Sequence, residues 1–114
     1  MSRLNIEGST ILESVLGAGN KLDSISQTLG ADYTVPAGAP TLLFLDPGGS
    51  ARNVDLPAEE AGLFYIICNT ADAAEVITVR NDAGTSVGCT PTQNEVAVVF
   101  CDGTSWHGFV GTAA

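Results

Sequence analysis

The sequence predicts an all-β fold: a small β-sandwich or jelly-roll-like barrel of about seven or eight short strands, preceded by an N-terminal arm or short helices. Short apolar runs rich in Val, Ile and Phe recur from residue 33 onward, as in strands. Turn-forming residues separate these runs at short intervals, which is typical of sandwiches and barrels. We therefore divide the chain into an N-terminal segment, residues 1–32, and a β-sandwich domain, residues 33–114.

The N-terminal segment has a weak helical pattern. Thr10 and Glu13 match a capping box, in which Thr10 is the N-cap. Gly17–Asn20 interrupts the pattern. The apolar residues at helical spacing are Ile11, Leu12, Val15 and Leu16, followed by Leu22, Ile25 and Leu29. Isolated helices this short are marginal in water, so two interpretations remain: two short helices, or an extended arm that becomes ordered against a partner.

The first strands of the sandwich domain are bounded by proline and glycine. Tyr33–Val35 is a strand start that Pro36–Pro40 closes. Thr41–Leu45 is a continuous apolar strand, and Asp46–Gly49 ends it with a strong turn signal. Asn53–Leu56 alternates between apolar and polar residues, as a strand with one buried face does.

The second half of the domain gives the clearest strand signals. Leu63–Asn69 is apolar on both faces and rich in β-formers, which predicts a central strand. Val76–Val79 is the next strand, and Ala83–Gly88 is expected to be a polar turn. Val96–Cys101 and Ser105–Val110 flank Asp-Gly, the strongest short hairpin signal in the chain.

Charge excludes several classes of partner. The chain has 114 residues, of which 13 are acidic and 4 basic, giving a net charge of −9. The basic residues Arg3, Lys21, Arg52 and Arg80 do not cluster. Nucleic-acid binding needs several cations to neutralise phosphates, and an anionic membrane also repels such a chain. We therefore expect neither nucleic acid nor a membrane as partner, and synthesis in a cytoplasm because the N-terminus lacks the apolar run of a signal peptide.

The residues that could carry chemistry are few and scattered. His107 is the only histidine, and the spacing shows no carboxylate and nucleophile to complete a triad, so a strand histidine is the simpler interpretation. One histidine and three scattered cysteines also make a poor zinc site. Glu59-Glu60 and the Asp72/Glu75 pair are expected to lie in solvated turns. The sequence thus predicts no catalytic residue, no cofactor and no metal site.

Tryptophan and cysteine are assigned structural roles. Trp106 beside the hairpin is expected to plug one end of the sandwich, because its ring contributes much to a small core. Cys68 and Cys101 lie inside apolar strands, so they are expected to be buried thiols. A Cys68–Cys101 disulfide on adjacent strands is the alternative.

Four phrases of the sequence resemble those of tailed-phage head decoration (cement), head-fibre and tail-fibre proteins. They are Asp46–Pro57, Asn69–Asp72, Ile77–Thr85 and Cys101–Trp106. The resemblance lies in the wording and order of the turns and covers about residues 33–110. It implies a non-enzymatic virion protein on the capsid exterior, a β-sandwich that binds the major capsid protein and stabilises the shell as a homotrimer.

Within this interpretation, the N-terminal segment supplies the contacts with a neighbouring subunit or the capsid. The expected interface residues are Leu4, Ile6, Ile11, Leu12, Val15 and Leu16. The alternative is a receptor- or carbohydrate-binding module of a phage head or tail fibre, with Tyr33 or Trp106 as an exposed aromatic platform. A small enzyme built around His107 is a third hypothesis.

Overall fold

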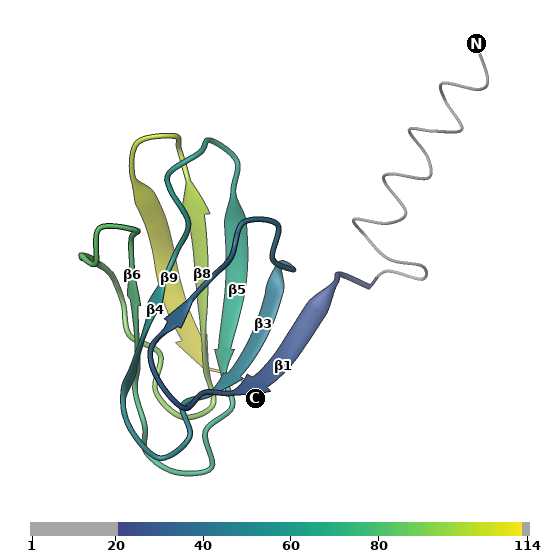
Figure 1. The fold of residues 1–114 in the computed structure, drawn as a ribbon, viewed down its shortest axis with the longest axis vertical. Helices are drawn as coiled ribbons and strands as arrows, with labels where there is room; N and C mark the ends of the chain where they lie inside the picture. The colour runs from purple at the N-terminus through teal and green to yellow at the C-terminus, as the bar shows by residue number, and fades with distance from the viewer. Residues whose placement is uncertain (1–20, 113–114) are drawn as a thin grey trace, which may run out of the picture.

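A computed structural model describes residues 21–112, which form nine β-strands and no helix. The strands make a five-stranded sheet in the order β1-β3-β5-β8-β9 and a four-stranded sheet in the order β2-β4-β6-β7 (Figure 1). Their bounds are β1 Ser24–Thr28, β2 Tyr33–Thr34, β3 Leu42–Asp46, β4 Arg52–Asp55, β5 Phe64–Asn69, β6 Ile77–Arg80, β7 Ser86–Cys89, β8 Glu95–Cys101 and β9 Trp106–Thr112. The all-β prediction is confirmed, and two sheets are consistent with a small β-sandwich.

The chain changes sheet at every connection from β1 to β6. Odd-numbered strands join the five-stranded sheet and even-numbered strands join the other. Each return to a sheet runs in the same direction, so β1, β3 and β5 are parallel neighbours, as are β2, β4 and β6. Only β6–β7 and β8–β9 are sequential antiparallel pairs, and β5 pairs antiparallel with β8. Parallel neighbours arise because the strand that lies between them in the chain belongs to the opposite sheet. Each sheet is mixed because it also contains at least one antiparallel pair.

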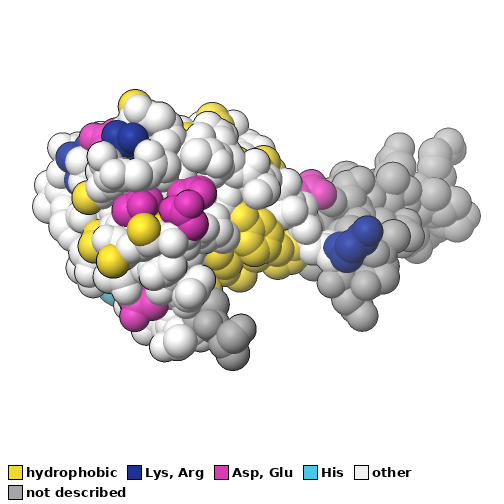
Figure 2. Space-filling model, turned by 90° about the horizontal axis from the view of Figure 1, so that it is seen from below, with side chains coloured by type: hydrophobic (Ala, Val, Ile, Leu, Met, Phe, Trp, Pro, Cys, Tyr) yellow, Lys and Arg dark blue, Asp and Glu magenta, His cyan; other side chains and the backbone are white. Residues whose placement is uncertain are grey.

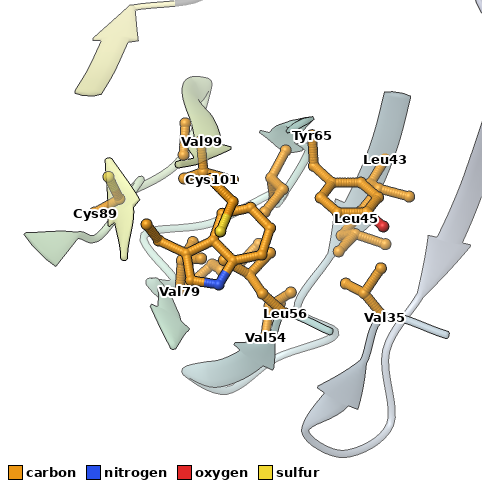
Figure 3. Packing of buried hydrophobic residues seen from close by; sticks show 14 of the residues in the cluster. Val35, Leu43, Leu45, Val54, Leu56, Tyr65, Val79, Cys89, Val99 and Cys101 are labelled. Atoms are coloured by element: carbon orange, nitrogen blue, oxygen red, sulfur yellow. The ribbon is translucent and has the colours of Figure 1, made fainter. Parts of the chain in front are cut away.

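The core lies between the inner faces of the two sheets. Alternate residues of each strand point inward, as the two-residue period of a strand requires. Figure 3 shows Leu43, Leu45 and Tyr65 from the five-stranded sheet facing Val54 and Leu56 from the segment that contains β4. The buried cluster comprises Leu29, Val35, Leu43, Leu45, Val54, Leu56, Tyr65, Ile67, Ile77, Val79, Cys89, Ala97, Val99, Cys101 and Trp106.

Two predicted turns contain glycines that the backbone requires. Gly48 has a φ of 77°, and a Cβ there would clash with the Leu29 carbonyl oxygen. Gly103 has a φ of 102° in the β8–β9 hairpin, where Asp102 N–H donates to the Ser105 carbonyl at 3.1 Å. Both turns therefore form where the sequence predicts them, with glycine at the left-handed positions.

Two elements differ from the sequence prediction. Residues at helical spacing around Ile25 form the strand β1, which pairs in parallel with β3. Leu29 is buried after this strand, and its N–H donates to the Asp46 carbonyl at 2.7 Å. The second half of the expected turn Ala83–Gly88 is instead part of β7, which begins at Ser86 and pairs with β6. The capping box and the first predicted helix lie outside the described residues.

Candidate interaction face

The outer face of the five-stranded sheet is apolar. It is formed by the side chains of β3, β5, β8 and β9 that point away from the core. We call this set the apolar sheet face; it comprises Leu42, Phe44, Phe64, Ile66, Cys68, Val96, Val98, Phe100 and Phe109. Phe64, Phe100 and Phe109 are 47%, 46% and 60% exposed. Three large aromatic side chains thus remain in water on one side of a small domain.

Strand register makes the apolar sheet face continuous. Ile66 lies between Leu42 and Val98, and Val98 pairs with Phe109, so one apolar row crosses four strands. A second row joins Phe44, Cys68 and Val96, and a third joins Phe64 and Phe100. Side chains directly opposite on adjacent strands have Cβ atoms about 4.5–5.5 Å apart, so they contact one another. Figure 2 shows hydrophobic side chains gathered in a patch on the surface of the molecule.

The outer face of the four-stranded sheet is polar by contrast. Arg80 on β6 donates two hydrogen bonds to Asp55 on β4, at 2.6 and 2.9 Å, and this pairing raises the pKa of the Arg80 guanidinium. Asn53 N–H donates to Asp32 at 2.9 Å, which lowers the pKa of that carboxyl. One side of the sandwich is therefore suited to water, whereas the other carries a surface of the kind that marks interaction sites.

His107 lies at the edge of the apolar sheet face. Its Nε2 donates to Asp102 Oδ2 at 2.9 Å, and its ring stacks on Phe100 with a centroid distance of 5.9 Å. The histidine hydrogen bond and the N–H groups of Ser105 and Thr104 hold the pKa of Asp102 well below its usual range. The sequence reasoning missed this partner, although the Asp-Gly hairpin that brings it close was recognised. Because Asp102 also closes the hairpin turn, the pair has a structural role.

Three carboxylates meet at the end of β3. The side-chain oxygens of Asp46, Asp72 and Glu75 lie within 4.8 Å of one another. Oxygen ligands of this type suit hard cations such as Ca²⁺. Two of them already accept backbone amides, because Gly48 N–H donates to Asp46 and Gly49 N–H donates to Glu75, each at 2.9 Å. The sequence predicts the Asp72/Glu75 pair but not the approach of Asp46, which depends on tertiary structure.

The candidate aromatic platform and the candidate disulfide are corrected. Trp106 is only 8% exposed and packs against Tyr65 with a centroid distance of 6.2 Å, so it is a core residue, as the plug interpretation predicts. Tyr33 is half-buried on β2. Cys68 points outward from β5 and is only partly buried, so the expectation of a buried thiol is wrong for Cys68 and confirmed for Cys101, which points into the core. The disulfide alternative is wrong, because both thiols are free. Burial raises the pKa of the Cys68 and Cys89 thiols.

A small hollow lies beside Tyr65 of β5. Its lining includes Ala37, Pro57, Glu60 and Tyr65, and its volume is about 210 Å³. Pockets for small molecules usually measure about 300–1,000 Å³, so this hollow is small for that purpose. The apolar sheet face is therefore the more extensive candidate.

The six interface residues expected in the N-terminal segment, Leu4, Ile6, Ile11, Leu12, Val15 and Leu16, lie outside the described residues. Within residues 21–112, no helix is long and apolar enough to cross a membrane. Comparison of the chain with protein-family models, with curated proteins and with solved structures found no match.

Proposed function

We propose that this chain is a non-enzymatic virion structural protein that binds the outer surface of a phage capsid and stabilises it, as a homotrimer. The resemblance of its turns to those of decoration proteins supports the virion and trimer parts of the proposal. Its partners are the major capsid protein and further copies of itself. A protein that binds the assembled shell and not the free subunits shifts the equilibrium toward the shell.

The observation that carries the proposal is the apolar sheet face. Aromatic side chains that are exposed in the free protein and become packed in the complex are common anchors of protein interfaces. Transferring apolar area from water is favourable by about 25 cal/mol per Å², so leaving this face uncovered has a continuing free-energy cost. A contact made within the homotrimer or with the capsid would remove that cost. The acidic remainder of the surface suits the capsid exterior, away from packaged nucleic acid.

The alternative, a receptor- or carbohydrate-binding module of a head or tail fibre, loses its tryptophan platform because Trp106 is buried. The stacked Phe100 and His107 rings are one exposed aromatic surface that could contact a sugar. This alternative predicts glycan binding that is lost in Phe100→Ala.

Co-sedimentation with capsids of the virus that encodes the chain tests the proposal. We expect the wild-type protein to co-sediment, and Phe109→Asp to reduce occupancy about tenfold, because it places a charge among apolar contacts. Thr78→Asp is the matched control, since it adds the same charge to the outer face of the four-stranded sheet. A wild-type protein that remains in the supernatant contradicts the proposal.

A deletion tests the N-terminal segment in the same assay. Because β1 begins at Ser24, the deletion must end at residue 20 to leave the five-stranded sheet intact. Circular dichroism checks that the β-structure is retained. We expect lower capsid occupancy; undiminished binding would remove the six N-terminal residues from the interface.

A further inference from the structure

We propose that residues 4–16, the apolar part of the N-terminal segment, are the layer that covers the apolar sheet face. The inference deepens the proposed function, because it names the partner of that face, but the contact itself does not depend on a capsid. It is argued from complementarity, from where the segment joins the sheet, and from size and charge.

The sequence and the structure leave two complementary surfaces. The five-stranded sheet has an apolar outer face with no described element packed on it. The N-terminal segment has an apolar pattern, centred on Ile11, Leu12 and Val15. The segment is too short to bury these residues in a core of its own. A sheet and an amphipathic helix each bury their apolar side against another layer, so each can satisfy the other.

The place where the segment joins the fold favours this contact. Residues 17–23 connect the segment to β1, the edge strand of the same sheet. Ser24 of β1 pairs with Leu42, which begins the row that ends at Phe109. Five strands about 4.8 Å apart span roughly 19 Å. The chain from Leu16 to Ser24 reaches about 26 Å when extended, so the segment can reach any strand of the face.

The dimensions of the face suit a segment of this length. The three apolar rows extend about 13 Å along the strands, and the four strands that carry them, β3, β5, β8 and β9, span about 14 Å. A helix has a diameter of about 10 Å, and residues 4–16 in helical form would be about 20 Å long, so one helix can cross all four strands.

Charge also distinguishes the segment from a second sandwich domain. Residues 1–21 contain two acidic and two basic residues, so the net charge of −9 resides in residues 22–114. Two sandwich domains brought face to face would repel each other, whereas the neutral segment adds no repulsion. Glu7 and Glu13 are balanced by Arg3 and Lys21.

Cys68 provides a built-in reporter of the contact. It is the partly exposed cysteine of the apolar sheet face, whereas Cys89 and Cys101 are only 1% and 5% exposed. We expect Cys68 in the full-length protein to react slowly with a maleimide, and about tenfold faster in Val15→Glu, which opposes docking of the segment. Ser14→Glu is the matched control, because it adds the same charge beside the apolar pattern. Trp106 fluorescence verifies that the sandwich is folded in each variant.

Cross-linking locates the contact directly. In Val15→Cys, we expect a short bis-maleimide to join residue 15 to Cys68, whereas Ser14→Cys gives a much lower yield. A product of monomer size places the segment on its own sheet, and a product of dimer size places it on a neighbouring copy; both support the proposal. Equal maleimide rates in all three proteins, together with no cross-link to Cys68, would overturn it. If Cys68 reacts rapidly until capsids are added, the segment is not the cover while the proposed capsid binding stands.

Discussion

Gly108 shows how one residue permits two sheets to approach. Gly108 is an exposed residue of β9, but an added Cβ would lie 2.5 Å from the Val98 carbonyl oxygen and 3.0 Å from Cys89 Sγ. Cys89 belongs to β7 of the opposite sheet. Glycine is therefore required here for close packing and not for a special backbone angle. The sequence does not reveal this, because Gly108 lies inside the predicted strand Ser105–Val110 and its neighbour Cys89 is distant in the sequence.

We predict that Gly108→Ala lowers the free energy of unfolding by about 1–3 kcal/mol, the usual cost of overpacking a filled site. Gly111→Ala is the matched control, because it lies on the same strand and an added Cβ there meets no atom within 4 Å. Urea titration followed by Trp106 fluorescence measures both variants. Equal midpoints for the two would contradict the close approach of β9 and β7.

Asp102 gives the fold a pH dependence in acid. Its pKa is lowered by the hydrogen bond from His107 and by two backbone N–H groups, so the folded state favours the charged carboxylate. A lowered pKa contributes stability that is complete above the ordinary value of about 3.9 and is lost as pH falls through the lowered value. Asn at this position retains an oxygen to accept the turn amides but lacks the charge.

We therefore predict that Asp102→Asn is less stable than the wild type at neutral pH, and that the difference shrinks as the pH falls below about 4. Urea midpoints measured from pH 7 to pH 2 check this. Asp82→Asn, a substitution in another exposed turn, controls for the loss of a surface charge. A difference that stays constant over the whole pH range would show that the charge of Asp102 is irrelevant.

At the scale of elements, local pattern was sufficient where a strand is apolar and bounded by turns. β5, β8 and β9 lie close to their predicted ranges because the Asp-Gly hairpin and continuous apolar runs are local signals. β1 was not predicted as a strand, because Leu22, Ile25 and Leu29 fit helical spacing. Its partner β3 is also not the next strand in the chain, since β2 between them belongs to the other sheet. The polar strand β7 is likewise specified by pairing with β6 and by packing against β9.

The end of β1 offers a test of its role in the fold. Leu29 is 3% exposed and packs in the core. We predict that Leu29→Ala lowers the free energy of unfolding by about 2–4 kcal/mol through a cavity in the core. The control is Gln27→Ala, because the Gln27 side chain, two residues earlier, is exposed. Its free energy of unfolding should stay within about 0.5 kcal/mol of the wild-type value. A small effect at Leu29 would indicate that β1 is not held by the sandwich.

The interaction face illustrates why the site was harder to predict than the fold. Its residues come from four strands, and only the sheet order places Phe44 beside Cys68 and Val98 beside Phe109. In the sequence these residues are indistinguishable from core residues, because β3, β5 and β8 are apolar at nearly every position. Continuous apolar runs indicated burial on both faces; the structure shows that one of those faces has no described cover.

The whole molecule combines this apolar face with a net charge of −9, so the proposed self-association should depend on salt in a distinctive way. Like charges on neighbouring copies repel over a Debye length of about 30 Å at 0.01 M salt but only about 8 Å at 0.15 M. We predict that the oligomer becomes more stable as salt rises over this range, because contacts through apolar groups do not weaken when charges are screened. Sedimentation equilibrium at several protein concentrations measures this. An oligomer that dissociates as salt is added would instead indicate an interface made by opposite charges, which the apolar sheet face does not provide.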